Sequence, residues 1–401
     1  MATSEAQLDE IAVENFREYL KIPSVQPNIN YDDCVIFIKK QANSLNLPVK
    51  VFEVCREKPV VIISWEGLEP EKSSILLNGH MDVVPVYPDE WKYPPFAAHM
   101  DEKGDIYARG SQDCKCISIQ HLEAIRRLKL NGIRLKRTIH ISFVPDEETG
   151  GKNGMGAFVE TQDFKNLNIG FALDESLPSG SDDTHVILYG EKCLCRIWIH
   201  CPGNCGHGSL LLENTAGEKL NVIIDRFMKF RESEKVKLKD PKVQYGDITS
   251  VNLTVIKGGV QLNVIPKELS VGFDIRIAPD VNHEKFENMI KGWCEEAGKG
   301  VYYTYENKDP FIENSKLDKS NIFWIAFKKA CDDSKVKLNP IICPGTTDAR
   351  YLRAIGIPAF GFSPLFDTPI LAHDHNEFLN KDIFLKGIQE FIKIIPAVAN
   401  V

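Results

Sequence analysis

The sequence predicts an α/β protein, a mostly parallel sheet with helices on both faces, interrupted by a smaller inserted α+β domain. Three observations lead to this prediction. The chain has 401 residues, which is too long for one ordinary hydrophobic core. Helical and strand patterns alternate in the first half and return near the end, as in parallel sheets covered by helices. The strands predicted in the middle of the chain, between these two regions, alternate apolar and polar residues. This alternation favours an antiparallel sheet with one open face.

The first part of the chain supplies the elements of the parallel sheet. Residues 6–20 carry apolar side chains at helical spacing and precede the proline-rich stretch KIPSVQP. The stretch 73–84, SSILLNGHMDVV, is largely apolar, as expected for a strand that is covered on both faces. Further strands are predicted at KVFEV, PVVIISW, RTIHISFVPDEE and NIGFALDE, and a helix at SIQHLEAIRRLKL.

A change of pattern places the domain boundaries. Residues 1–188 and 311–401 form a discontinuous first domain, and residues 189–310 form the inserted domain. In the insertion, VILYGEKCLCRIWIHC is predicted to be one long strand, and two helices and two alternating strands follow it. The helix and buried-strand pattern of the first part then returns in NIFWIAFKKACD and GIPAFGFSP.

Composition and charge exclude several classes of function. The formal net charge is −8 and lysine and arginine form no dense block, so we expect no nucleic-acid partner. No stretch approaches the ~20 apolar residues that span a bilayer, and the acidic N-terminus lacks a secretory signal. We therefore expect a cytoplasmic protein without a membrane partner. The eleven irregularly spaced cysteines favour reduced thiols, with a structural four-cysteine zinc site as the alternative.

Side chains with the chemistry of metal ligands follow several predicted strands. His80 ends one apolar run, and the pairs Glu147–Glu148 and Asp174–Glu175 end two others. The carboxyl ends of parallel strands form the active-site edge of such sheets, so we expect these side chains to meet there. The candidate ligands in chain order are His80, Asp113, Glu148, Glu175 and His373.

The composition of this set indicates which metal it would bind. Nitrogen and carboxylate ligands without cysteine suit zinc in a catalytic role, where an open position holds water. Three carboxylates and two histidines exceed what one tetrahedral ion needs, so a bridging carboxylate would accommodate two ions. Each residue also has a plainer interpretation as a solvated histidine, a charge near a helix start or a polar strand end. Their joint position at successive strand ends favours the metal site.

Six short motifs stand in order along the chain: GHMDVVP, RGSQDCK, VPDEETGG, ALDE, GGVQLNVIP and HDHNE. Together they resemble the motif series of the co-catalytic zinc peptidase and deacylase family. The resemblance covers essentially the whole chain, including FREYLKIPSVQP and TTDARYLRAIGIPAFGFSP. It implies the zinc exopeptidase-like fold, with the inserted domain as a dimerisation and lid domain.

The resemblance implies two Zn²⁺ ions per subunit and a role for each candidate ligand. It also implies a cis peptide bond after the bridging aspartate, between Asp113 and Cys114. The ligands of one ion would be His80, Asp113 and Glu175, and those of the other Asp113, Glu148 and His373.

Three further residues resemble catalytic residues of the family. Glu147 resembles the general base, and on extended backbone it would point away from its neighbour Glu148. Asp82 resembles the carboxylate that orients His80 by accepting its other ring N–H. His207, in GNCGHGS of the inserted domain, resembles the histidine that stabilises the developing oxyanion, often in the neighbouring subunit's site.

The implied activity is hydrolysis of the amide bond of N-acyl-L-amino acids to a carboxylate and a free L-amino acid. A zinc-bridged water would attack, with Glu147 as its base. The substrate's α-carboxylate needs a cation, for which Arg350 and Arg276 are candidates, with Asn263 as a polar contact. Structural salt bridges are the alternative role of both arginines. The resemblance also implies a homodimer joined through the inserted domain.

Three other functions stay open at this point. A dipeptidase or carboxypeptidase on the same scaffold would need an acidic anchor for a free α-amine, which the sequence does not locate. A catalytically inactive metal-binding interaction protein would carry a degenerate ligand set, whereas this set is intact. A metal-free binding module for small molecules would leave the clustered carboxylates unexplained.

Overall fold

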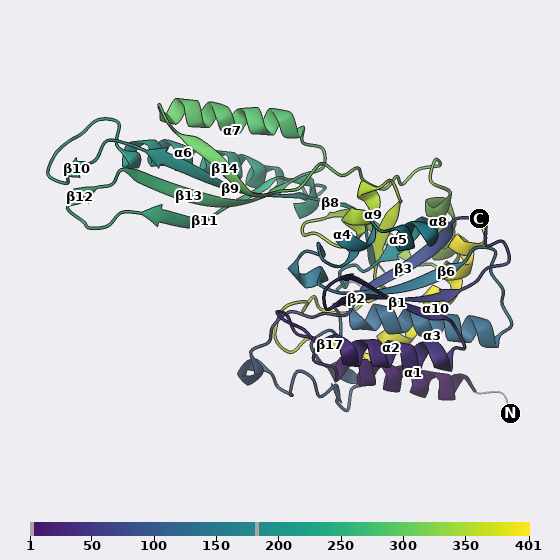
Figure 1. Cartoon of the computed structure of the whole chain (residues 1–401). Helices are drawn as coiled ribbons and strands as arrows, with labels where there is room; N and C mark the ends of the chain where they lie inside the picture. Colours follow the sequence, from purple (N-terminus) through teal and green to yellow (C-terminus); the bar gives the residue numbers. More distant parts are fainter. Residues whose placement is uncertain (1–3, 181–183) are drawn as a thin grey trace. The chain divides into compact units, whose positions relative to one another are not determined.

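The computed structural model describes residues 4–180 and 184–401, which form two compact units (Figure 1). The first unit comprises the chain up to Tyr189, Ser315–Pro340 and Thr347–Val401, and the second comprises Gly190–Asn314 and Ile341–Thr346. The boundaries drawn from the sequence lie near 188 and 311, and they do not include the short return at 341–346. A backbone hydrogen bond from Lys192 N–H to the Cys343 carbonyl, 3.2 Å long, joins that return to the second unit.

A mixed sheet forms the centre of the first unit. Its strands, in the order in which they neighbour one another, are β1 (Val49–Cys55), β2 (Lys58–Trp65), β6 (Ile139–Val144), β3 (Ser74–His80), β7 (Ile169–Asp174), β16 (Ala359–Phe362), β8 (Thr184–Glu191) and β15 (Lys337–Cys343). The middle strands β6, β3, β7 and β16 pair in parallel, whereas β1, β2 and β8 form antiparallel pairs. The predicted parallel sheet is confirmed at the centre of the unit.

Helices cover both faces of this sheet and enclose two apolar cores (Figure 1). Strand β2 shows the division, because Val61 and Ile63 pack into one core while Val60 and Ile62 pack into the other. The first core is covered by α1 (Glu5–Leu20), α2 (Asp32–Ser44), α3 (Lys115–Leu130), α8 (Ile322–Asp333) and α10 (Lys381–Ala399), and the second by α4 (Met155–Phe158), α5 (Gln162–Asn166) and α9 (Ala349–Ala354). Both faces are therefore buried, as the apolar strands predicted.

A small separate sheet brings two distant loops together in the first unit. It consists of β4 (His99–Met100), β5 (Asp105–Tyr107) and β17 (Phe378–Asn380). Phe378 pairs antiparallel with Tyr107, so the segment just before β17 lies beside the segment just after β5. These two segments carry His373 and Asp113.

The second unit is an antiparallel sheet with helices on one face. Its strands pair in the order β11 (Ser250–Gly258), β13 (Glu268–Ile277), β9 (Cys193–Pro202) and β14 (Tyr302–Lys308), and its helices are α6 (Ala216–Lys237) and α7 (His283–Ala297). Ile197 and Ile199 of β9 pack into the core with α6 and α7, whereas Arg196 and Trp198 lie on the open face. A short ribbon pairs β10 (Gly206–His207) with β12 (Val264–Ile265). The open-faced α+β arrangement is as predicted.

One predicted element is wrong. The stretch expected to form a single strand of the inserted domain breaks at Lys192. Its first half, β8, joins the sheet of the first unit beside β16, and only β9 belongs to the second unit. The polar stretch 190–192 interrupts the apolar pattern at this point, but the sequence prediction treated both halves as one strand. Among the described residues, no helix is both long and apolar enough to cross a membrane.

Candidate metal centre

The candidate ligands converge at the carboxyl ends of three neighbouring parallel strands. His80 is the last residue of β3, β6 on one side leads into the short turn η2 (Glu147–Thr149), and Glu175 follows β7 on the other side. Because these strands run in parallel, their ends lie side by side. Asp113 directly precedes Cys114 at the start of α3, and His373 lies in the loop before β17.

Asp113 lies between the two histidines. Its Oδ1 is 3.0 Å from Nε2 of His80, and its Oδ2 is 3.2 Å from Nε2 of His373. Glu175 Oε1 is 3.3 Å from the same His80 nitrogen, and Glu148 Oε2 is 3.1 Å from the same His373 nitrogen. The five side chains therefore form two groups, each with one histidine and one glutamate, that share one aspartate.

Close packing of α3 against β3 positions Asp113. A Cβ on Gly79 would lie 2.4 Å from Ser118 Oγ, so only glycine lets the helix approach the strand this closely. The peptide bond between Asp113 and Cys114 is cis, as predicted.

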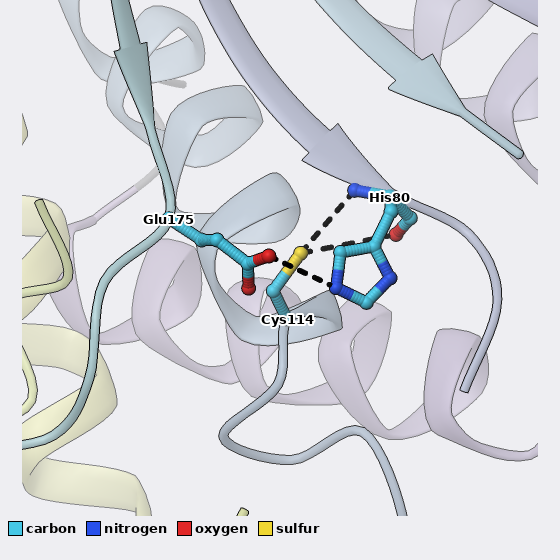
Figure 2. Close-up of side chains that lie close together, drawn as sticks. All are labelled: His80, Cys114 and Glu175. Carbon is cyan, nitrogen blue, oxygen red and sulfur yellow. Dashed lines mark hydrogen bonds and ion pairs between the residues drawn. The ribbon is translucent and has the colours of Figure 1, made fainter. Parts of the chain in front are cut away.

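The Cys114 thiol lies beside the first group. Its sulfur accepts the backbone N–H of His80 at 3.2 Å and faces the Glu175 carboxylate (Figure 2). A His80 nitrogen, the sulfur and a Glu175 oxygen lie within 4.8 Å of one another, which makes a second donor set for a cation. Burial and the nearby Glu175 charge raise the pKa of this thiol, whereas Asp113 offers oxygens whose pKa is lowered. The set that includes the Asp113 oxygens is therefore a better candidate metal site than the set that includes the Cys114 sulfur.

The Asp82 carboxylate does not accept the His80 ring N–H that the sequence predicted for it. Ring nitrogen Nδ1 lies 2.8 Å from the Asp82 backbone oxygen but 3.7 Å from Oδ1 of its side chain. The carboxylate instead accepts the backbone N–H groups of Glu147 and Glu148, each at 3.2 Å, and the Gln26 amide at 2.8 Å. Strand β3 ends at His80, so the two side chains do not share a strand face. Asp82 contacts the histidine through its main chain and the glutamate turn through its side chain.

The sequence predicted extended backbone at Glu147 and Glu148, but the structure has a turn there. It is a 3-10 turn that follows Asp146, whose φ is 63°. The Asp146 carboxylate is fixed by Lys58 Nζ at 2.8 Å and by the Tyr31 hydroxyl at 2.9 Å. The turn is thus held from outside the site, and the Glu148 side chain reaches His373.

Burial and mutual repulsion shift the titration of the acidic groups. Burial, together with the charge of Asp113, raises the pKa of Glu148 to about 7 and that of Glu175 to about 8. Burial and the charge of Glu175 also raise the pKa of Glu147. Hydrogen bonds to Asp113 and Glu148 raise the pKa of His373 to about 10. The site holds an excess of buried acidic groups that a bound cation would relieve.

These residues fit a divalent metal. Glu148 Oε1 is buried and has no hydrogen-bond partner within the part of the chain that the structure describes. Ligand atoms of His80, Asp113 and Glu148 lie within 4.8 Å of one another. A buried carboxylate oxygen without a donor is costly unless a cation binds it. Oxygen and nitrogen donors suit zinc, and the shared Asp113 suits two ions.

Arg350 is held by the protein in the first unit. It is buried, its Nη2 donates to the Gly150 carbonyl, and the guanidinium lies 4.8 Å from the centre of the Tyr351 ring. Gly150 directly follows η2, so Arg350 supports the segment that carries the two glutamates. Its predicted contact with substrate stays a prediction.

Three predicted residues lie in the second unit. His207 is exposed on β10, and Gly208 N–H donates to the Asn263 carbonyl at 2.7 Å, so these two regions share one end of the unit. Arg276 lies near the other end of β13, where its Nε is 2.8 Å from Asp274 Oδ1. The structure thus brings His207 and Asn263 together and keeps Arg276 apart from them.

Comparison with known proteins assigns this arrangement to a family. Residues 76–397 match the model of peptidase family M20/M25/M40. The chain belongs to this family. Aminoacylase-1 of Homo sapiens is 44% identical over 97% of this chain and 96% of that protein. Aminoacylase-1 of Dictyostelium discoideum is 44% identical over 96% of this chain and 97% of that protein.

Solved structures of M20 proteins share the fold across the whole chain. The metallo-carboxypeptidase Sso-CP2 from Sulfolobus solfataricus has a TM-score of 0.73 at 18% identity, covering 97% of this chain and 99% of that chain. The Bacillus subtilis YXEP protein, described as a dinuclear metal binding peptidase, has a TM-score of 0.67 at 17% identity, covering 98% and 99%. At these identities the likeness shows the fold alone.

Further buried acidic residues surround the candidate ligands, and sequence reasoning assigned no role to Asp146, Asp348 or Glu377 among them. Asp174 accepts the Asn78 side-chain amide at 2.9 Å and the Ala349 N–H at 2.8 Å, which fixes the end of β7. Glu377 is fully buried beside the Asp113 loop. Both stand within the quoted motifs: Asp174 directly precedes Glu175, and Glu377 ends the motif HDHNE that begins with His373. The set of buried acidic neighbours comprises Asp82, Asp146, Asp174, Asp348 and Glu377.

Proposed function

We propose that this chain is a zinc-dependent N-acyl-L-amino-acid amidohydrolase, which releases a carboxylate and a free L-amino acid. The observation that carries the proposal is the shared aspartate: Asp113 faces His80 with one oxygen and His373 with the other. Curated relatives called Aminoacylase-1, about 44% identical over nearly the full length, support the substrate class.

Two zinc ions per chain are the proposed cofactors. One would be held by His80, Asp113 and Glu175, and the other by Asp113, Glu148 and His373. When bound, such ions lower the pKa of a coordinated water from ~15.7 toward ~7 and polarise the substrate carbonyl. The orphaned oxygen of Glu148 and the acidic excess of the site support this assignment.

Glu147 is the proposed general base. It lies next to the ligand Glu148, and Asp82 holds the backbone of both residues in place. Its carboxylate would accept the proton of the attacking water and then donate it to the leaving amine. A buried carboxyl whose pKa is raised suits a group that must both take and give a proton near neutral pH.

Residues of the second unit would complete the reaction. We propose that His207 stabilises the oxyanion, that Asn263 contacts the substrate, and that Arg276 binds its α-carboxylate. Their grouping supports a division of work, because His207 and Asn263 share one end of the unit while Arg276 occupies the other. Arg350 stays a second candidate for binding the α-carboxylate, and it would also support the glutamate turn through its hydrogen bond to the Gly150 carbonyl.

A homodimer joined through the second unit is part of the proposal. Large apolar side chains are exposed on β11 and near β10 and β12, which is unusual for a surface that stays in water. They are Leu210, Leu211, Val255, Ile256, Val260, Leu262 and Val264. We also propose a cytoplasmic location, supported by eleven free cysteines.

The test is a substrate panel on zinc-loaded protein. We expect turnover of N-acetyl-L-methionine and other N-acyl-L-amino acids, with unblocked dipeptides much slower. Preference for unblocked dipeptides would assign a dipeptidase instead. Turnover of neither class, with zinc bound, would leave a metal-binding protein without this activity.

A further inference from the structure

Glu377 is a fully buried residue whose carboxylate accepts hydrogen bonds from the loop that carries Asp113. Its Oε2 accepts Arg109 Nη1 at 2.7 Å and the backbone N–H of Gly110 at 3.1 Å. Its Oε1 accepts the backbone N–H groups of Gln112 at 2.6 Å and Asp113 at 3.3 Å. One side chain therefore satisfies successive main-chain donors of the segment that ends at the shared aspartate.

Gln112 connects the same two segments in the opposite direction. Its amide nitrogen donates to the carbonyls of Pro369 and Phe378, at 3.0 and 2.8 Å, and its amide oxygen accepts the Leu371 N–H at 2.9 Å. Gln112 is buried and all its amide contacts reach the stretch that carries His373. Two buried side chains thus join the Asp113 loop to the His373 loop on both sides.

The His373 loop needs such support because its conformation is unusual. His373 and Asn376 both have positive φ, 65° and 58°, in a segment outside helices and strands. A loop in this region of backbone space keeps one conformation only where its surroundings fix it. The contacts of Glu377 and Gln112 supply that constraint, and they set the separation between the two candidate ligands.

We propose that Glu377 is a positioning residue that holds Asp113 against His373 and thereby sets the affinity for the second metal ion. This proposal rests on the proposed function. Both oxygens of the Glu377 carboxylate accept hydrogen bonds from protein donors, and the Arg109 guanidinium balances its charge, so Glu377 acts through Asp113 and not as a ligand. Such outer residues typically change metal affinity about 10–100-fold.

The decisive variant is Glu377→Gln, because an amide keeps the size but presents hydrogens to donors that need an acceptor. Zinc-free protein is titrated with Zn²⁺ against a competing chromophoric chelator, which gives the affinity of each ion. We expect the second Zn²⁺ to bind about 10–100-fold more weakly, and hydrolysis to recover at high Zn²⁺ concentration.

Glu123→Gln is the matched control. Glu123 is equally buried, accepts Arg126 Nε and the Asn15 amide at 2.9 Å each, and lies on α3 away from the ligands' contacts. We expect this variant to lose stability while it keeps wild-type Zn²⁺ affinities. Equal weakening in both variants would overturn the proposal, since the effect would then be general.

The outcomes also separate this proposal from the function itself. Unchanged Zn²⁺ affinity in Glu377→Gln overturns the positioning role and leaves the proposed function intact. Failure of the wild-type protein to bind two Zn²⁺ overturns the metal assignment, and with it both. If Glu377→Gln does not fold, Gln112→Met decides: weaker second-ion binding supports the loop connection, and unchanged binding overturns it.

Discussion

The two units present their candidate functional residues in opposite ways. In the first unit, side chains from distant segments meet in direct contacts around Asp113. His80 and Glu175 are buried, Asp113 and Glu148 are half-buried, and His373 is exposed. In the second unit, His207 and Asn263 are exposed at one end of the sheet, while Arg276 near the other end is paired with Asp274. Ligands that already contact one another can bind a metal within their own unit, whereas the exposed His207 and Asn263 side chains are accessible to a substrate. We infer that metal affinity belongs to the first unit and that the second unit acts on the substrate.

The largest effect should come from the base in the first unit. Glu147→Gln is expected to lower turnover of N-acetyl-L-methionine by ~10²–10⁴, because an amide cannot take the proton from the attacking water. The number of Zn²⁺ ions per chain should stay the same, since Glu147 is not a proposed ligand. Rate assays and metal analysis on the same sample check both statements, and near-normal rates with metal retained would remove Glu147 from this role.

A smaller effect is expected from the second unit. His207→Ala should lower turnover by ~10²–10³, the usual cost of losing one oxyanion donor, without changing Zn²⁺ affinity. His200→Ala serves as the control, because His200 lies on β9 of the same unit and contacts Glu268 and Thr304. A loss of bound zinc in His207→Ala would contradict the division of work between the units.

Co-expression of two inactive variants sharpens this test. A dimer of one Glu147→Gln chain and one His207→Ala chain has one complete site if His207 acts in the partner's site, and none if it acts in its own. Recovered activity in the mixed dimer therefore assigns the histidine to the neighbouring subunit. Absence of recovery, with mixed dimers shown to form, assigns it to its own site.

Metal removal should affect only one unit. All candidate ligands lie in the first unit. Free metal at a concentration of 100 times its Kd should therefore stabilise that unit by about 2.7 kcal/mol, which lowers the equilibrium constant for its opening roughly 100-fold. After chelation we expect faster amide hydrogen exchange in residues 108–113, 147–151 and 369–377. Exchange in β9 and β13 of the second unit should not change, and a matching increase there would show that the units are coupled.

The sequence was sufficient for the general architecture and for three of the candidate ligands, which follow strand ends, whereas Asp113 and His373 lie in loops and were proposed from the motif resemblance. His80, Glu148 and Glu175 each come after an apolar run, and parallel strands necessarily bring such ends together. The break at Lys192 was missed although the polar stretch 190–192 interrupts the apolar pattern, because the sheet that each half joins depends on its pairing partners. Local patterns therefore predict which residues end a strand better than which sheet the strand joins.

Contacts beyond the ligands were harder to predict, because they depend on loops. Asp82 was expected to bind His80 as a neighbour on one strand, but β3 ends first and the carboxylate reaches the glutamate turn instead. Glu377 drew no attention, although it contacts a loop more than 260 residues earlier in the chain. Such partners have no spacing rule, so only the folded chain identifies them.

The smallest effect concerns acid stability in the first unit. His121 lies in α3, fully buried against Phe391, and burial lowers its pKa to about 3. The unfolded chain takes up this proton below about pH 6.5 and the folded chain does not, so stability is present above that pH and is lost as the pH falls toward 3. His121→Phe should therefore reduce the stability difference between pH 7 and pH 5 by about 2 kcal/mol in urea unfolding of zinc-free protein. Phe391→Leu, which removes the ring partner but no titrating group, should lower stability equally at both values, and an unchanged pH dependence in His121→Phe would show that this histidine is not the acid-sensitive group.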